Sequence, residues 1–262
     1  MIKIKNFLGT ISLPLFVSLV FLFLYLPLLI LIVFSFNGAP FPAPWTGFSL
    51  KWYRELMESP EIWRSFYTSI IIGASATFLS IMMTLSLVYY NLMGGKLKKS
   101  LLLFYGNILV PEIVLAVALL CFLTFLSIPL GFLTLIISHT ILCSGYVFPI
   151  VYGRFLSIDK SVIEASLDLG ATMSNTFFKI VVPLLKPSLL AAGLLAFIIS
   201  FDDFVLSFFC AGSNTQTLSL FIYSMIRSGV SPIVNALSTI LLLLSSLLVM
   251  VFCYLNIKTK IF

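Results

Sequence analysis

Three carboxylic acids interrupt long apolar stretches of this sequence and are the residues best placed to do chemistry. Glu112 lies within the run 101–125, and Asp202 and Asp203 lie near the far end of the run 187–209. A carboxylate at the depth of a bilayer is costly unless it faces water, a partner or the interior of a helix bundle. Such groups attract cations, and a neighbouring ring such as Phe204 can bind an alkylammonium ion. These four residues predict a path for a cation.

The same acids have a second interpretation, in which they only satisfy polar groups on neighbouring helices. Successive residues of a helix point about 100° apart, so at most one of Asp202 and Asp203 can point squarely at a central path. The sequence does not say which of the two that is.

No arrangement typical of an enzyme is visible. The run Gly94-Gly95-Lys96 lacks the glycine spacing and the hydroxyl residue of a phosphate-binding loop. The single histidine, His139, is expected to be a packed, hydrogen-bonded residue. Because the four cysteines lie far apart in or beside apolar runs, they predict neither a disulfide nor a metal cluster. We therefore expect no catalytic residue, no metal and no cofactor in this chain.

The composition indicates a membrane protein. Hydrophobic residues make up 61% of the chain, charged residues 9%, and the mean hydropathy is +1.18, whereas soluble domains carry about 25% charged residues. The 262 residues suffice for six spans of about 20 residues each. We expect one all-α membrane domain over residues 1–262, with spans at about 7–36, 61–91, 101–125, 131–152, 187–209 and 233–255. A short helix over 48–57 is expected in the first outer loop.

The basic residues predict the orientation. Cytoplasmic loops of membrane proteins are enriched in Lys and Arg. With both termini in the cytoplasm, eleven of the fifteen basic residues fall inside, and four fall outside: Lys51, Arg54, Arg64 and Arg227. They are scattered at span ends without an arginine-rich face, so nucleic acid is not an expected partner.

The segment 153–186 is the longest soluble-looking part of the chain. Its apolar residues recur at helical spacing among charged ones, which predicts short amphipathic helices. Gly170 can adopt the left-handed conformation that ends a helix, so we expect a sharp bend there. The result would be a helix–Gly–helix elbow just outside the membrane, with one charged and one apolar face. An elbow of this kind can also simply lie on the lipid surface.

The elbow carries a motif. The order Glu164-Ala165-Ser166-x-x-x-Gly170, followed after nine residues by Ile180-x-x-Pro183, closely resembles the signature of ABC importer permeases. That signature usually has Ala where this chain has Ser166, and Leu where it has Val182. The resemblance implies that the elbow is a coupling helix that binds a cleft on a cytoplasmic ATPase. The coupling residues would be Glu164, Ala165, Ser166, Gly170, Ile180 and Pro183.

Three further stretches resemble the second permease of spermidine/putrescine ABC importers. They are Trp45–Tyr53, the Ser-Phe-Asp-Asp-Phe run 200–204, and the Ser-Gly-Val-Ser-Pro run 228–232. This resemblance implies a type I ABC importer permease fold in a bacterial inner membrane. It also implies a polyamine path that includes Asp202, Asp203, Phe204 and Glu112. The partners would be a second, homologous permease, ATPase subunits that bind the ATP, and a substrate-binding protein.

Two other functions remain open from the sequence. The first is an importer permease of the same fold for another solute such as iron(III), although carboxylates in the path disfavour anions. The second is a secondary transporter or channel. Such proteins often show inverted repeats and broken helices; no repeat is visible, and a coupling elbow would serve no purpose there. The sequence does not identify the polyamine. It also does not show whether the partner permease is a copy of this chain.

Overall fold

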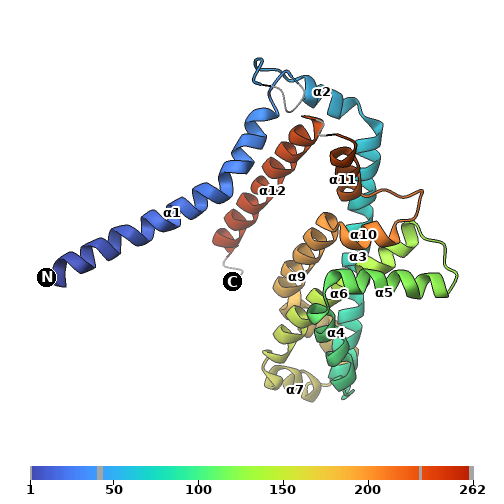
Figure 1. Cartoon of the computed structure of the whole chain (residues 1–262). Helices are drawn as coiled ribbons and strands as arrows, with labels where there is room; N and C mark the ends of the chain where they lie inside the picture. Colours follow the sequence, from blue (N-terminus) through green and yellow to red (C-terminus); the bar gives the residue numbers. More distant parts are fainter. Residues whose placement is uncertain (1, 40–43, 230–231, 260–262) are drawn as a thin grey trace. The chain divides into compact units, whose positions relative to one another are not determined.

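The structure, a computed structural model, describes residues 2–39, 44–229 and 232–259, so Val230 and Ser231 of the Ser-Gly-Val-Ser-Pro run lie outside it. Within these ranges the chain is helical, apart from loops and one isolated bridge between Asn37 and Phe48. The all-α prediction is confirmed. The helices follow one another along the chain as Figure 1 shows.

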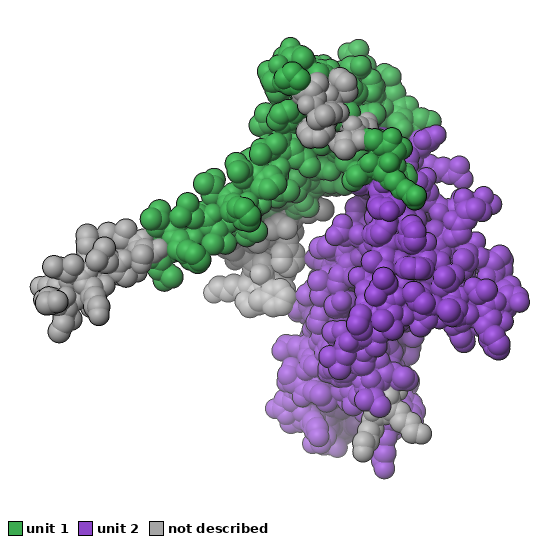
Figure 2. All heavy atoms as spheres, in the orientation of Figure 1, with its two compact units in different colours: residues 1–60, 224–260 green, residues 61–223, 261–262 purple. Residues whose placement is uncertain are grey.

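The chain divides into two compact units, drawn in green and purple in Figure 2. Unit 1 comprises residues 1–60 and 224–260, and unit 2 contains 61–223. Each unit has its own packing and is described by itself. The expected single membrane domain over 1–262 stays a prediction.

Unit 1 contains α1 (Ile2–Phe34), α2 (Lys51–Glu58) and α12 (Pro232–Thr259), with α12 packed against both of the others. The loop before α2 is held by polar contacts around Asn37. The indole N–H of Trp52 donates to the Asn37 carbonyl at 2.7 Å, and the Asn37 side chain accepts the Thr46 N–H at 2.9 Å. Phe36 stacks on Phe48. The predicted short helix is confirmed, with Trp52 buried on its inner side.

Unit 2 is built around α6 (Phe132–Leu156) and α9 (Val182–Asp202), which pack along each other. The helices α3 (Pro60–Leu92), α4 (Lys98–Leu109), α5 (Glu112–Phe125) and α10 (Val205–Cys210) also belong to this unit, and α11 (Leu218–Ser228) begins in it. Small side chains such as Ala76, Ala192 and Ala196 are fully buried. In helices within a membrane, small residues at interfaces let the backbones approach closely.

Four described helices are long and apolar enough to cross a bilayer: Leu13–Phe34, Pro60–Leu92, Phe132–Leu156 and Met173–Asp202. The pair Leu101–Leu109 and Glu112–Phe125 passes the same test as one span bent by 117°, and Pro232–Leu247 is a shorter apolar helix. The bounds agree with the predicted second and fourth spans to within a few residues, whereas Leu13–Phe34 starts later than the predicted first span and Pro232–Leu247 ends before the predicted sixth span does. The count of six spans stays a prediction.

The expected fifth span, 187–209, is wrong in two respects. Pro187 was expected to open it, but the helical segment already starts at Met173, because the Thr172 hydroxyl accepts the Asn175 N–H at 3.3 Å. The short α8 (Met173–Thr176) and the π-helical turn η1 (Phe177–Val181) lead directly into α9. The span was also expected to be continuous to 209, but α9 ends at Asp202 and α10 starts at Val205. The chain is therefore broken at the expected acidic pair.

Candidate functional site

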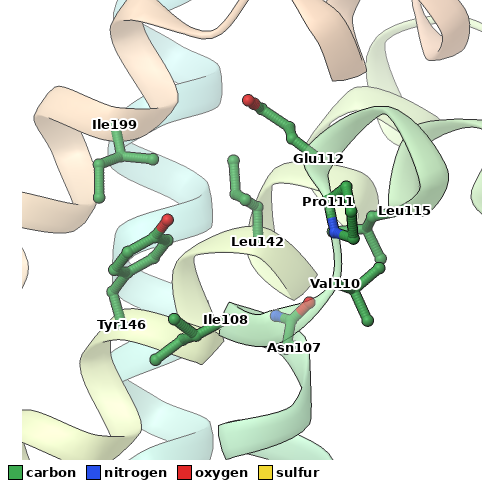
Figure 3. Close-up of a pocket in the computed structure, with 9 residues that line it drawn as sticks. All are labelled: Asn107, Ile108, Val110, Pro111, Glu112, Leu115, Leu142, Tyr146 and Ile199. Atoms are coloured by element: carbon green, nitrogen blue, oxygen red, sulfur yellow. The ribbon is translucent and has the colours of Figure 1, made fainter.

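Unit 2 contains two helix breaks, and a cavity lies beside one of them. The first separates α4 from α5 at Val110 and Pro111, and the second separates α9 from α10. A cavity of about 300 Å³ lies beside the first break, and Figure 3 shows the side chains around it. Four helices line it, through Asn107, Ile108, Val110, Pro111, Glu112, Leu115, Leu142, Tyr146 and Ile199. Its size is at the lower end of the range for small-molecule pockets.

Glu112 is the acidic side chain that lines this cavity. It is the first residue of α5, directly after Pro111, and its side chain is exposed. Proline cannot continue α4, and a carboxylate is favoured at the positive N-terminal end of the helix that follows. In Figure 3 the carboxyl group projects from the start of α5 toward the side of α9 that carries Ile199. It interacts with the carboxyl group of Asp203. The predicted Glu112 and Asp203 are thus brought together.

Asp203 is buried and is held by the start of α10. One carboxyl oxygen accepts the Leu206 N–H at 3.2 Å, and the other accepts the Ser207 N–H at 2.9 Å. The first N–H groups of a helix lack partners within it, and an aspartate just before the helix is among the best acceptors for them. This capping explains why the chain stops one helix at Asp202 and starts another at Val205.

A buried histidine completes this site. His139 of α6 is 1% exposed, and its Nδ1 lies 2.7 Å from the Ser200 hydroxyl of α9. Its Nε2 lies 3.3 Å from the Ser207 hydroxyl and 3.5 Å from an Asp203 carboxyl oxygen. The expectation that His139 is packed and hydrogen-bonded is confirmed. Its position against Asp203 was not expected, because 64 residues separate the two in sequence.

The other two predicted path residues lie away from the cavity lining. Asp202 is the last residue of α9 and is exposed. Phe204 packs on Tyr223 with 4.7 Å between ring centroids and on Phe208 with 5.6 Å. The expected helical offset between Asp202 and Asp203 does not apply, because the helix ends between them. Burial distinguishes the two acids instead.

The sequence did not single out two polar residues of the cavity, Asn107 and Tyr146. The Asn107 amide donates to the Ile141 carbonyl of α6 at 2.6 Å. A β-carbon on Gly145 would lie 2.8 Å from the Asn107 nitrogen, so glycine permits this approach of α4 to α6. Figure 3 shows the Tyr146 hydroxyl pointing into the cavity. A polar residue one turn before a proline, as Asn107 is before Pro111, was the available signal.

The elbow forms as predicted around Gly170, but it is shorter than 153–186 because α6 continues to Leu156. Its first arm is α7 (Lys160–Asp168), which begins where the Asp159 carboxylate accepts the Ser161 N–H at 2.9 Å. That hydrogen bond lowers the pKa of Asp159 below its ordinary value. Gly170 has φ +83°, and the Gly170 and Ala171 N–H groups donate to the Leu167 and Ser166 carbonyls. These two bonds make the Schellman motif that ends many helices.

The two arms of the elbow are joined by Ser166. Its hydroxyl lies 3.0 Å from that of Thr176 in α8, and both residues are buried. The Ser166 hydroxyl therefore stabilises the elbow from within. Glu164, Ala165 and Gly170, in contrast, are exposed. The predicted coupling residue Ile180 is half-buried in η1, and Pro183 is exposed near the start of α9.

The apolar side chains of the elbow point in two directions. Phe177 and Val181 are buried in the core of unit 2, and Ile163 packs against that core. Leu169 is 89% exposed, and Val162 is 42% exposed. Phe177 and Val181 thus anchor the elbow to its own bundle, and its apolar residues do not all face the same way. The exposed part next to Gly170 is what a partner could bind.

The arrangement is suited to passing a cation and not to making or breaking bonds. It combines two interacting carboxyl groups with apolar walls at the junction of broken helices. A nearby cation favours the ionised form of a carboxyl group, so this pair suits a cation better than an anion. Among the described residues no group of three or more His, Cys, Asp or Glu side chains could hold a metal ion.

Comparison with known proteins agrees with this picture. No family model matches the sequence. The chain is 40% identical over 237 residues to the spermidine/putrescine transport system permease protein PotC of Escherichia coli K12, covering 89% of each chain. It is 36% identical to PotC of Haemophilus influenzae, covering 89% of this chain and 92% of the relative. It is 32% identical to the E. coli putrescine transport system permease protein PotI, covering 85% and 82%.

A solved structure shares the fold. It is the crystal structure of a bacterial ABC transporter involved in the import of the acidic polysaccharide alginate. One of its chains matches with a TM-score of 0.71 over 98% of this chain and 96% of that chain, at 15% identity. The likeness confirms the predicted ABC importer permease fold. At this identity it indicates nothing about the solute.

Proposed function

The chain belongs to the family of spermidine/putrescine transport system permease proteins, and from this membership we propose that it is the membrane-spanning subunit of an ATP-driven polyamine importer. Members of this family are transport subunits and not enzymes in their own right. The polyamine relatives favour this function over an importer for iron(III) and over a secondary transporter.

The observation that carries the proposal is the position of Glu112. It lines a cavity between broken helices and interacts there with Asp203. A polyamine has ammonium groups separated by short methylene chains. Carboxyl groups suit the ammonium ends, and the apolar walls made by Leu115, Leu142 and Ile199 suit the methylene groups. Discontinuous helices in transporters commonly surround such sites.

Energy would reach this path through the elbow. The exposed residues around Gly170 would bind a groove on a cytoplasmic ATPase in the helix-in-groove manner. ATP would be bound by that partner and not by this chain. The complete importer would contain ATPase subunits, a second homologous permease and a substrate-binding protein.

The proposed location is a bacterial inner membrane, with both termini and the elbow on the cytoplasmic side. The eleven-to-four distribution of basic residues supports this orientation. Cysteines introduced singly at Lys96 and Ser213, in a background without native cysteines, would test it with an impermeant label. We expect the two positions to react from opposite sides. Reaction of both from the same side would contradict the orientation.

The path is tested by Glu112→Gln in the reconstituted importer. The amide keeps the size and some hydrogen bonding of the side chain but removes its charge. We expect uptake of labelled putrescine or spermidine to fall by about tenfold or more, as for the loss of a charged hydrogen-bonding group. The matched control is Glu58→Gln at an exposed position of α2. Wild-type uptake by assembled Glu112→Gln complex would show that this acid does not serve the path.

A further inference from the structure

His139 occupies a position that capping alone does not explain. It comes from the first half of α6, and its two ring nitrogens contact both sides of the break between α9 and α10. Nδ1 meets Ser200, two residues before the end of α9. Nε2 meets Ser207, in the first turn of α10, and Asp203 in the break itself. One side chain therefore bridges three points of a discontinuous helix.

The hydrogen-bonding capacity of a neutral imidazole fits this position. A neutral histidine has one N–H donor and one acceptor nitrogen. With the proton on Nε2, it faces the Asp203 carboxylate and the Ser207 hydroxyl, which can accept. Nδ1 is then free to accept the Ser200 hydroxyl proton at 2.7 Å. Each group at the break thus has a complementary partner.

The break needs such a partner from outside its own chain segment. The two N–H donors of Leu206 and Ser207 bind Asp203 only from the α10 side. They would move with α10 if it swung relative to α9. A buried carboxylate is costly unless it is paired and hydrogen-bonded. His139, anchored in α6, contacts both Asp203 and Ser200 near the end of α9.

We infer that His139 is a positioning residue. It keeps the end of α9 and the start of α10 together and so keeps Asp203 next to Glu112. The effect on transport rests on the proposed function. The effect on the break itself does not. His139 is not one of the residues that line the cavity and is not proposed to bind the solute.

Three substitutions distinguish this role from simple packing. In His139→Gln the amide reaches the position of Nε2 and can still meet Asp203. In His139→Asn the shorter amide reaches only the position of Nδ1 and can still meet Ser200. His139→Leu fills the space but bonds neither. A residue needed only for packing would tolerate leucine, which fills the space, better than the smaller asparagine.

The first measurement is amide hydrogen exchange of the purified chain in lipid nanodiscs. For His139→Leu and His139→Asn we expect about tenfold faster exchange in 204–210, the change that the loss of a hydrogen bond to a charged group produces. Segments of α3 should exchange as in the wild type. His139→Gln should stay close to wild type in both regions.

The second measurement is uptake by the assembled importer. The maximal rate should fall by about tenfold in His139→Asn and by much less in His139→Gln. The two results separate the two proposals. If the wild-type importer moves no polyamine, the proposed function fails, while the exchange contrast still decides the role of His139.

The inference is overturned if His139→Leu exchanges like the wild type over 204–210, or if the two amides behave alike. Should the leucine variant fail to fold, Ser207→Ala takes its place, because it removes one partner of Nε2 with little change in size. We expect faster exchange in 204–210 for Ser207→Ala and exchange close to the wild type for Ser200→Ala, which removes only the partner of Nδ1. The reverse order would count against the inference.

Discussion

The elbow differs from the site formed by Glu112, His139 and Asp203 at the break between α9 and α10, here called the broken-helix site. The two are held by contacts of different range in the sequence. In the elbow the deciding contacts join residues that are close in sequence: Asp159 with Ser161, Gly170 with Leu167, and Ser166 with Thr176. In the broken-helix site His139 contacts Ser200 and Ser207, 61 and 68 residues away. Glu112 is 91 residues from Asp203, with which it interacts.

Under the proposed function, this difference corresponds to what each region would do. The elbow would keep one local shape and present it to a partner, for which hydrogen bonds within a few turns are sufficient. The broken-helix site would relate helices that move with respect to each other when the path opens and closes, so its contacts would run between helices. Substitutions in the two regions are expected to fail in different ways.

The largest effect is expected at the broken-helix site, from Asp203→Asn. The amide can accept one of the two α10 N–H groups but loses the charge. We expect about 2 kcal/mol of lost stability for the charged hydrogen bonds, and at least about tenfold slower polyamine uptake. The measurements are thermal unfolding of the purified chain and uptake by the assembled importer.

Asp202→Asn is the matched control, because Asp202 is adjacent but exposed. It should unfold and transport nearly as the wild type does. If the Asp202 variant loses uptake and the Asp203 variant does not, the exposed acid serves the path and the buried one does not.

The second effect concerns the elbow, through Gly170→Leu. A β-carbon at Gly170 would meet open space within this chain, so any change in the elbow itself must come from the φ of +83°. A left-handed conformation costs an ordinary residue about 1–2 kcal/mol. We expect the importer to assemble but to hydrolyse ATP without matching uptake, measured as the ratio of solute moved to ATP consumed.

Gly153→Leu provides the comparison, since Gly153 is equally open but has a helical backbone within α6. Gly170→Asn should restore much of the coupling, because asparagine tolerates the left-handed region. Normal coupling in Gly170→Leu would show that the bend is not the coupling element.

A smaller effect is expected from Ser166→Ala, which removes the hydrogen bond between the two arms of the elbow. We expect a loss of about 1 kcal/mol, typical of one neutral hydrogen bond, with uptake close to that of the wild type. The same loss should appear in Thr176→Val, and the double variant should lose little more than either single one. Fully additive losses would mean that the two hydroxyl groups do not interact.

The smallest effect should be confined to the start of α7. The pKa of Asp159 is lowered by the Ser161 N–H, so its capping of α7 is complete above the ordinary aspartate pKa and is lost as the pH falls through the lowered value. Hydrogen exchange of 161–163 should therefore be faster in Asp159→Ala than in the wild type at neutral pH, and the difference should shrink in acid. Asp159→Asn, which keeps an acceptor, is the control. A difference that persists unchanged in strong acid would contradict a role for the charge.

Much of the elbow could be predicted because its signals act within a few residues. Gly170 ends a helix wherever it occurs in that context, and the charged and apolar residues around it alternate with helical spacing. The direction in which the apolar residues face was not predictable in the same way. Phe177 and Val181 point inward because they pack into a core made by α3, α6 and α9.

The sequence by itself determined the membrane class, several span positions, the elbow, and the presence of three acids in apolar runs, since each depends on composition or on spacing within a few turns. It also contained an unused signal, an aspartate three residues before Leu206, which is typical of a helix start. Only the tertiary structure decided that Asp203 is buried and Asp202 exposed, that Glu112 meets Asp203, and that His139 lies across the break. The physical reason is that burial and contacts between distant residues depend on how whole helices pack, and no local pattern records which faces will meet.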